Sequence, residues 1–415
     1  MARRAWGMLT GCLIGAALFP ACSSSSGRVS LQLYDSPDPS GATAQAAAKC
    51  STPAYSITYD KLPNAADSQR QQLVRRLAAH DSGVDLMALD VTWEAEFAEA
   101  KWIVPWSGAD AQQVEQTTLN GPLQTAMWNG QLVAAPWTTN TELLWYRSDL
   151  VPKAPATWDQ MIADAVGLAK AGKPHYVEEQ GAQYEGLTVW FNTMVASAGG
   201  TVLNPQGTAP ALDGAARTAL TAMGDMARSP AADPSLSNTE ENDARLAMES
   251  GSAAFEVNYP FVWASMQKDK PAFYKSFTWA PFPQVVAGKP AKPTIGGLDL
   301  AVSAYSKHKD LDFQAAMCLR DAANQEQLAV TGGLPPTLRS LYANPSPAFV
   351  QEYPFYKDIL SALDSGSVRP KTPAYQNVSI VISHELSPPG SASPQKVGTL
   401  DSQIKDALAS KGLVP

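Results

Sequence analysis

Val84-Asp-Leu-Met-Ala-Leu-Asp90 is the stretch of sequence that decides the fold. Its apolar run is interrupted only by Asp85, which is typical of a strand buried within a sheet, and Asp90 stands at the strand's carboxyl end. Strand and helix patterns alternate around it over 29–34, 42–50, 55–59, 67–79 and 92–100. This alternation predicts an α/β lobe with a largely parallel sheet.

A second set of elements follows further along the chain. We expect strands over 143–146, 175–179, 253–257 and 296–302. We expect helices over 157–169, 187–196, 215–227, 240–249 and 311–328, and an irregular Pro-rich segment over 271–293. This second set predicts a second α/β lobe, in keeping with a chain too long for one ordinary core.

The N-terminus has the features of an exported lipoprotein. Arg3 and Arg4 precede an apolar stretch, 11–19, that is too short to span a bilayer, and Ala21 stands directly before Cys22 as in a bacterial lipobox. We therefore expect a signal peptide over 1–21, a lipid on Cys22 and a polar tether over 22–28. The alternative is an ordinary signal peptide in which Cys22 is incidental. Either way the protein is placed outside the cytoplasm, and the lipid would anchor it to the outer face of the cell membrane.

Charge and composition exclude one class of partner. The net charge is −8, and the 31 Lys and Arg residues are scattered without a basic run, which disfavours nucleic acid. The chain has 11 Trp and 13 Tyr residues, whose rings either pack in a core or stack on the C–H faces of sugars.

Two cysteines remain for the folded body, Cys50 and Cys318. In an oxidising compartment we expect them to pair, the alternative being two separate buried thiols. Cys50 ends the first helix and Cys318 lies in a late one, so a bridge requires the chain to return to the first lobe after visiting the second. Two lobes with more than one crossover form a hinged clamshell. The expected lobes are 29–139 with 297–331, and 140–296 with 332–415.

Motifs for covalent chemistry are missing from the sequence. There is no G-x-S-x-G, G-x-G-x-x-G, P-loop or H-E-x-x-H, and the four histidines are isolated. Ser306-Lys-His-Lys309 matches S-x-x-K only in a charged turn. We expect no catalytic residue, metal or cofactor. Since a glycoside hydrolase needs only two suitably spaced carboxylates, a lipid-anchored hydrolase remains the alternative from another class.

Stretches from nearly the whole length of the folded chain carry a family resemblance. They are Arg75-Arg-Leu, Asp85-Leu-Met-Ala-Leu-Asp-Val-Thr-Trp93, Glu96-Phe-Ala-Glu-Ala100, Thr138-Thr-Asn-Thr-Glu-Leu-Leu-Trp-Tyr-Arg147, Glu185-Gly-Leu-Thr-Val-Trp-Phe-Asn-Thr193, Arg245-Leu-Ala-Met-Glu249, Thr294-Ile-Gly-Gly-Leu298, Gly332-Gly-Leu-Pro335 and Val368-Arg-Pro-Lys-Thr-Pro-Ala-Tyr-Gln376. In this order they resemble the trehalose-binding lipoproteins of mycobacterial-type trehalose-recycling ABC transporters, within the maltose type of the extracellular solute-binding family.

The resemblance implies a fold and a function. The fold would be a type II periplasmic-binding-protein-like clamshell with hinge crossovers. The protein, a monomer and not an enzyme, would capture a disaccharide, foremost trehalose, and deliver it to ABC permease subunits in the membrane. The Cys50–Cys318 pair also falls where that family has its own pair.

The resemblance also implies a set of ligand-binding residues. They are Gln69, Asp90, Asn140, Glu241, Tyr259, Gly297, Leu298 and Arg369. Asp90 follows a strand's carboxyl end, where open α/β sheets place ligands, and Arg369 offers a planar fork to adjacent hydroxyls. The alternatives are structural: a helix cap for Asp90, turn geometry for Asn140 and a favourable helix-start charge for Glu241.

Two departures from the family leave the exact sugar open. The family has a tryptophan before Pro260, where this chain has Tyr259, and the segment 266–283 is shorter here. Both lie near the expected cleft on the second lobe. Another disaccharide or glucoside, such as maltose, is therefore the alternative cargo.

Overall fold

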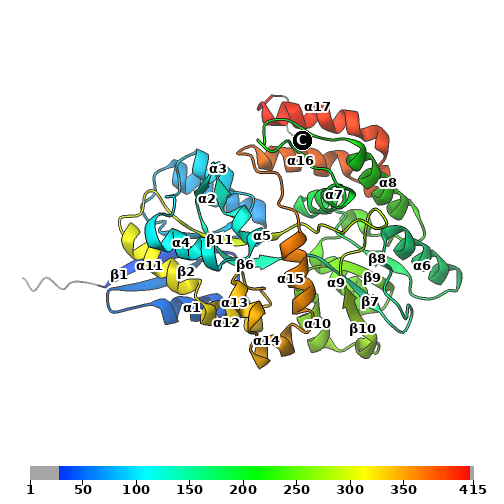
Figure 1. Cartoon of the computed structure of the whole chain (residues 1–415), viewed down its shortest axis with the longest axis horizontal. Helices are drawn as coiled ribbons and strands as arrows, with labels where there is room; N and C mark the ends of the chain where they lie inside the picture. The colour runs from blue at the N-terminus through cyan, green and yellow to red at the C-terminus, as the bar shows by residue number, and fades with distance from the viewer. Residues whose placement is uncertain (1–27, 412–415) are drawn as a thin grey trace, which may run out of the picture.

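The structure, a computed structural model, describes residues 28–411 and consists of two α/β lobes side by side (Figure 1). Each lobe is built on its own sheet with helices packed around it. The expected two-lobe fold is confirmed. The expected signal peptide and Cys22 lie outside the described residues.

Lobe one is built on a five-stranded sheet of order β2-β1-β3-β11-β6. Strands β1, β2 and β3 are parallel, whereas β11 is antiparallel to both of its neighbours, β3 and β6. The sheet is thus largely parallel, as expected, with one reversed strand where the chain re-enters the lobe. Its elements are β1 (Val29–Asp35), α1 (Ala42–Cys50), β2 (Tyr55–Lys61), α2 (Ala66–Ala78), β3 (Leu86–Asp90), α3 (Glu94–Glu99), α4 (Gly108–Thr117), α5 (Asn120–Thr125), β4 (Met127–Trp128), β5 (Gln131–Leu132), β6 (Ala135–Asn140), β11 (Gly296–Val302), α11 (Lys309–Leu319) and α12 (Ala322–Gly332).

Lobe two is built on a four-stranded mixed sheet of order β10-β7-β9-β8, in which only β8 and β9 pair in parallel. Its elements are β7 (Leu143–Arg147), α6 (Trp158–Lys170), β8 (Tyr176–Glu178), α7 (Glu185–Ala198), α8 (Gly214–Arg228), α9 (Glu241–Ser250), β9 (Ala253–Asn258), α10 (Phe261–Asp269), β10 (Phe277–Ala280), α16 (Tyr375–Leu386) and α17 (Val397–Leu408).

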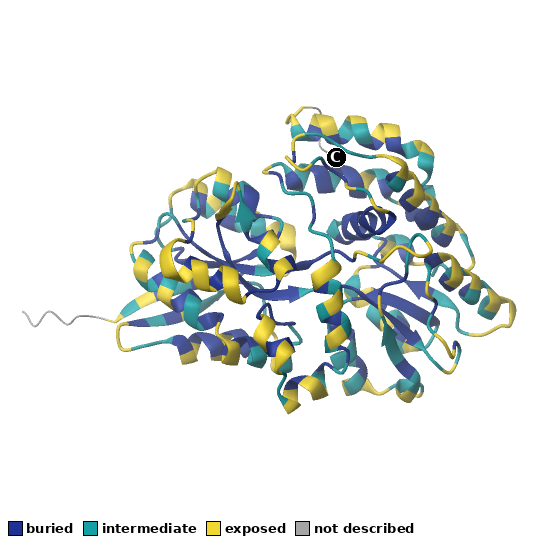
Figure 2. Cartoon of the chain, viewed as in Figure 1, coloured by how far each residue is buried: buried dark blue, intermediate teal, exposed yellow. Residues whose placement is uncertain are grey.

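Helix α7 forms the centre of lobe two. Every residue from Gly186 to Ala198 is buried, and Figure 2 shows the helix almost entirely in the buried colour. A helix that is buried all round must find partners for its polar side chains inside the protein. Asn192 and Thr193 find them on the segments that connect the lobes.

Three segments that connect the lobes contact these two residues of α7. The first segment contains Glu142, the second contains Thr294 and the third contains Ser367. Asn192 Nδ2 donates to Thr294 Oγ1 (2.9 Å), on the second segment, and to Ser367 Oγ (3.3 Å), on the third. Thr193 Oγ1 lies 3.2 Å from Glu142 Oε2, on the first segment, and 2.8 Å from Thr294 Oγ1. Helix α7 therefore holds all three crossovers against lobe two.

Three further helices lie at the junction of the two lobes: α13 (Arg339–Ala343), α14 (Pro347–Glu352) and α15 (Tyr356–Ser365). They contact α12 and α5 of lobe one, and their apolar residues share a core cluster with Trp145 and Phe277 of lobe two. The expected lobe boundaries stay predictions. The structure adds that 339–365 contacts both lobes.

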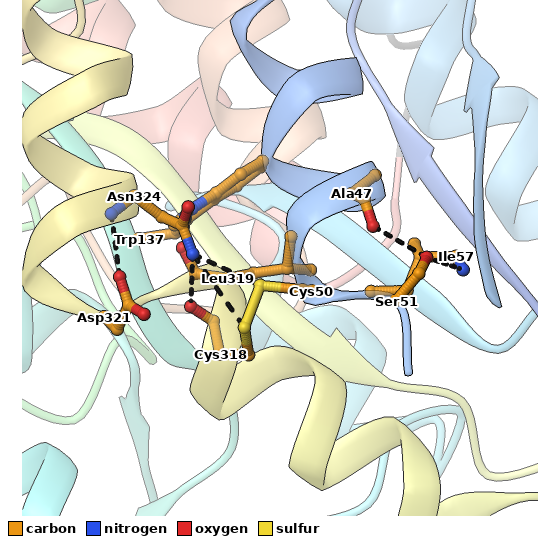
Figure 3. Close-up of a disulfide and its surroundings, with 9 residues drawn as sticks. All are labelled: Ala47, Cys50, Ser51, Ile57, Trp137, Cys318, Leu319, Asp321 and Asn324. Atoms are coloured by element: carbon orange, nitrogen blue, oxygen red, sulfur yellow. Dashed lines mark hydrogen bonds between the residues drawn. A yellow bond between two sulfur atoms is a disulfide. The ribbon is translucent and has the colours of Figure 1, made fainter. Parts of the chain in front are cut away.

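A disulfide joins Cys50, at the end of α1, to Cys318 in α11, 268 residues further along the chain (Figure 3). The expected pairing is confirmed. Asn324 Nδ2 donates to Cys50 Sγ (3.2 Å) and to the Cys318 carbonyl (2.8 Å), so the bridge also fixes the start of α12. The bond lies wholly within lobe one.

Some predicted elements differ from the structure. The single helix expected over 311–328 is two helices, because Asp321 adopts an extended backbone and its side chain accepts from Asn324 N (2.7 Å) to cap α12. The Pro-rich segment expected to be irregular contains β10, which pairs with β7. The strand expected over 84–89 is β3, shifted to 86–90.

Candidate ligand-binding cleft

A cavity of about 420 Å³ lies between the lobes. Lobe one contributes the start of α2 and the facing ends of β3, β6 and β11, and lobe two contributes the starts of α7 and α9, the end of β9 and the third crossover. The lining residues are Asn64, Ala65, Ala66, Asp67, Asp90, Asn140, Tyr184, Glu185, Gly186, Val189, Glu240, Glu241, Tyr259, Thr294, Gly296, Gly297 and Arg369.

Asp90 is the last residue of β3 and enters the cavity from lobe one. Its Oδ1 accepts from Thr92 N (3.0 Å) and Thr92 Oγ1 (2.8 Å), which fixes the carboxylate in the turn before α3. The helix itself begins only at Glu94, so Asp90 caps the turn and not the helix. Its other oxygen accepts no hydrogen bond from residues 28–411, and a ligand hydroxyl can use it.

Asn140 ends β6 and stands opposite Gly296 on β11. Its Oδ1 is buried and has no hydrogen-bond partner within residues 28–411. A Cβ on Gly296 would lie 2.1 Å from that oxygen, so the glycine leaves room for it. Gly297 has φ +138°, and a Cβ there would lie 2.3 Å from the Thr138 carbonyl. The floor of the cleft therefore needs both glycines.

Arg369 is the cation of the cleft and is only 6% exposed. Its Nη1 donates to Glu185 Oε1 of lobe two (2.8 Å), and its Nη2 reaches Asp90 Oδ1 of lobe one (3.5 Å). Burial alone would lower the pKa of Arg369, but the carboxylates of Asp90 and Glu185 outweigh it and raise that pKa well above the ordinary value. The guanidinium stays charged and bridges the lobes, while its buried Nε has no partner within the described chain.

Glu185 holds Arg369 in place and is itself held by two hydroxyls of α16. Tyr375 Oη donates to Glu185 Oε1 (2.5 Å), and Ser379 Oγ donates to Glu185 Oε2. Burial raises the pKa of the Glu185 carboxyl, and Arg369 with these hydroxyls opposes that rise. Arg369 and the two hydroxyls of α16 thus fix the Glu185 carboxylate from several sides in one hydrogen-bonded network.

Glu241 and Tyr259 are placed by one buried amide, Asn258. Its Nδ2 donates to the Glu241 carbonyl (2.9 Å) and to Glu256 Oε1 (2.7 Å), and its Oδ1 accepts from Tyr259 N (2.8 Å). The start of α9 and the end of β9 are thereby tied together. Burial raises the pKa values of both the Glu241 carboxyl and the Tyr259 hydroxyl.

Further carboxylates lie behind the lobe-two wall. Burial raises the pKa of Glu142 to about 7, that of Glu256 to about 8 and that of Glu178 to about 9. Burial also raises the pKa of Glu179 well above its ordinary value. At neutral pH Glu178 and Glu256 are therefore largely protonated, and they can act as hydrogen-bond donors.

Direct contacts close one side of the cleft. Gln376 Nε2, on α16, donates to Asp67 Oδ1, on α2 (3.0 Å), and Lys371 Nζ donates to the carbonyl oxygens of Gln124 (2.6 Å) and Met127. With the Arg369–Asp90 pair, the segment from 369 to 376 contacts lobe one through three side chains.

The structure brings together six of the eight expected site residues: Asp90, Asn140, Glu241, Tyr259, Gly297 and Arg369. Gln69 and Leu298 do not line the cavity. Gln69 is buried behind the wall, where its Nε2 donates to the carbonyl oxygens of Pro63 (2.9 Å) and Asn64 (3.3 Å) and so supports the cleft loop. Leu298 packs against the core of lobe one, because its side chain points to the opposite face of β11.

Tyr184 and Glu185 are the main lining residues that sequence reasoning missed. Glu185 opened one of the stretches that carry the family resemblance, and it follows a tyrosine at the start of a helix. That signal was available. Its partners on α16 were not, because they lie far along the chain.

A metal site and a membrane-spanning helix each require a recognisable arrangement of residues. Within residues 28–411, no cluster of three or more His, Cys, Asp or Glu side chains has a geometry suited to a metal ion. No described helix combines the length and apolarity needed to cross a bilayer.

Comparison with known proteins gives consistent results. A family model for bacterial extracellular solute-binding proteins matches residues 40–326. A probable ABC transporter-binding protein of Deinococcus radiodurans is 28% identical over 323 residues, which cover 75% of this chain and 76% of that protein. Maltose-bound MalE3 of T. maritima superimposes with a TM-score of 0.80 at 25% identity, covering 91% of this chain and 99% of that one. A solute-binding protein of Agrobacterium radiobacter in complex with ribitol has a TM-score of 0.77 at 19% identity, covering 92% and 98% of the two chains, and shows the fold alone.

Proposed function

The chain belongs to the bacterial extracellular solute-binding protein family, and from that premise we propose that it captures a sugar between its lobes for an ABC importer. The sugar we propose is a disaccharide, foremost trehalose. Closure of the lobes around it would create the surface that the permease subunits recognise. No bond in the sugar is made or broken.

The observation that carries this proposal is the composition of the cleft. A cavity of about 420 Å³ is lined from both lobes by carboxylates, an amide, an arginine and two tyrosine rings. Sugars present many hydroxyls, which donate to carboxylates and accept from a guanidinium, together with C–H faces that stack on aromatic rings. The cavity is within the size range of small-molecule sites.

Trehalose is the finer part of the proposal and rests on the resemblance of the stretches quoted above. The maltose-bound MalE3 structure supports a disaccharide of similar size. Because Tyr259 offers a smaller stacking surface than the family's tryptophan, maltose or another glucoside is the alternative cargo. A lipid on Cys22 would keep the protein on the outer face of the membrane, beside its permease.

Calorimetry on the chain without residues 1–22 tests the proposal. Trehalose, maltose, sucrose and glucose are titrated separately, and we expect trehalose to bind with a dissociation constant near micromolar, about −8 kcal/mol. A preference for maltose or sucrose would leave sugar capture standing and replace the cargo. Absence of binding by any of them would contradict the proposed function.

The same samples also test the alternative of a glycoside hydrolase. Each sugar is incubated with the protein overnight, and free glucose is measured enzymatically. We expect none above the protein-free control. If more moles of glucose were released than moles of protein were present, the protein would be turning over its substrate. That result would contradict the proposal that the sugar is bound unaltered.

A further inference from the structure

The charges that line the cleft are unequal. Its carboxylates are Asp67, Asp90, Glu185, Glu240 and Glu241, while Arg369 is the one cationic residue among the described lining residues. Arg369 is already bonded to Asp90 and Glu185. The lobe-two wall around Glu241 is left without a cation from the protein.

Glu241, like Asp67 and Glu240, forms no ion pair with any described residue. Glu240, Glu142 and Glu179 on the surrounding elements add negative potential at Glu241 whenever they are ionised. A backbone N–H at the start of α9 and the Tyr184 hydroxyl oppose the rise in the pKa of Glu241 that burial causes, but neither is a cation. Ionised carboxylates in a partly buried wall are costly unless a cation pairs with them.

The rings beside Glu241 favour the same kind of ligand. Tyr184 and Tyr259 line the cavity with it, and the face of an aromatic ring attracts a cation. An ammonium group placed there would donate charge-assisted hydrogen bonds to Glu241 and lie against a ring. A hydroxyl at the same place also donates to the carboxylate, but it brings no positive charge.

A second, independent feature points to the rest of the ligand. The Arg369 side chain is 94% buried, lines the same cavity and has an Nε donor that no described residue accepts. That donor requires an oxygen acceptor, as a sugar hydroxyl or ring oxygen provides. The cleft thus offers a donor at Arg369 and, at Glu241, a carboxylate that has no ion-pair partner among the described residues.

We infer that the cleft is suited to carbohydrates that carry a protonated amine, with the ammonium group against Glu241 between Tyr184 and Tyr259. This inference rests on the proposed function and narrows its cargo. Neutral sugars bind the same residues less tightly. Sugars that carry a carboxylate or phosphate are rejected, because the cleft has no free cation to meet them.

Calorimetry with a matched ligand series tests this inference at pH 7. The series is trehalose, its 2-, 4- and 6-aminodeoxy derivatives and its uronic acid, with glucose and glucosamine as a pair that does not depend on the disaccharide. We expect at least one amine to bind about tenfold more tightly than its neutral parent, and the uronic acid to bind at least tenfold more weakly. The inference is overturned if every amine binds no better than its parent, while binding of the neutral sugar alone would leave the proposed function intact. If no ligand of the series binds, both fail.

The ratio of amine to neutral affinity identifies the residue responsible. In Glu241→Gln we expect this ratio to fall to about one, whatever happens to the affinity for trehalose. Glu115→Gln, on the exposed face of α4 in lobe one, makes the same change in net charge and should keep the tenfold ratio. An equal fall in both variants would attribute the preference to overall charge and would overturn the assignment to Glu241.

Discussion

The two walls of the cleft are built in different ways. The lobe-one wall is made of strand ends, two glycines, the start of α2 and the carboxylate of Asp90, which accepts from Thr92 in its own turn and from Arg369 across the cleft. The lobe-two wall carries the arginine and both tyrosines, and its side chains are held by a second layer from α7, β9 and α16.

From this difference we expect a particular order of events on binding. Lobe two presents a surface whose polar groups are already oriented, so a sugar can dock there at little cost in conformational entropy. Lobe one then supplies Asp90 and backbone as it closes. The predictions below test this division, beginning with the largest expected effect.

The first prediction concerns what stabilises each lobe. The disulfide lies within lobe one, and replacing both Cys50 and Cys318 by serine should lower the free energy of unfolding by about 5–6 kcal/mol in the chain-entropy model. Urea unfolding followed by tryptophan fluorescence measures the loss. Because neither cysteine lines the cleft, the sugar affinity of the folded variant should change less than about threefold. An unchanged unfolding curve would mean that lobe one is held by packing alone.

The second prediction concerns the residue shared by both walls. Arg369→Ala leaves Glu185 and Asp90 without their cation, and trehalose affinity should fall at least a hundredfold, about 3 kcal/mol. Calorimetry measures it, with circular dichroism as a check on folding. Arg369→Lys keeps the charge without the fork and should recover only part of the loss. Full recovery by lysine would show that the two-pronged bridge is unnecessary.

The third prediction compares the supports behind the two walls. Glu185→Gln weakens the hold on Arg369 and should reduce trehalose affinity about tenfold. Thr92→Ala removes the hydroxyl that donates to Asp90 but leaves the backbone N–H of residue 92 and the contact with Arg369, so we expect a loss below about threefold. Equal losses in the two variants would contradict a preorganised lobe two facing a simpler lobe one.

The fourth prediction concerns pH. An unfolded glutamate titrates near pH 4.3, whereas burial raises the pKa of folded Glu256 to about 8. The folded state therefore binds the proton more tightly, and the stability this confers is complete at acidic pH and is lost as the pH rises to about 8. Glu256→Gln stays neutral and keeps the acceptor for Asn258. Its melting temperature should match the wild type at pH 4 and exceed it by roughly 2–4 °C at pH 9. A difference that is independent of pH would show that Glu256 does not titrate in this range.

Elements with a clear apolar period could be predicted closely from the sequence. The helix at 42–50 and the strand at 296–302 have the expected bounds. Strand β6 was missed, because Ala135-Pro-Trp-Thr-Thr-Asn140 contains a proline and polar threonines. Those threonines are buried because β6 pairs with β11, a strand that lies more than 150 residues further along the chain.

The candidate site was predictable where it follows strand ends. Asp90 stands at the end of β3, a position that topology makes significant. Asn140 came from the family resemblance, because β6, the strand that it ends, was missed. Glu185 was missed because its importance comes from Arg369 and Tyr375, which lie 184 and 190 residues further along the chain. Gln69 was included because of the family resemblance, which does not give the direction of its side-chain amide. In the structure that amide donates to the Pro63 carbonyl and not into the cavity.

Because α7 is hydrogen-bonded to all three crossovers, movement of the lobes can be measured relative to this helix. When the two lobes open, Asn192 and Thr193 should move together with lobe two. We then expect the backbone to bend only in the few crossover residues that lie between α7 and the sheet of lobe one. A fluorescent probe attached near α7 would then stay still relative to the docked sugar, while a second probe on α4 would swing. The distance between the two dyes would then report whether the cleft holds a sugar. Helix α7 already provides the rigid attachment point that such a sensor needs.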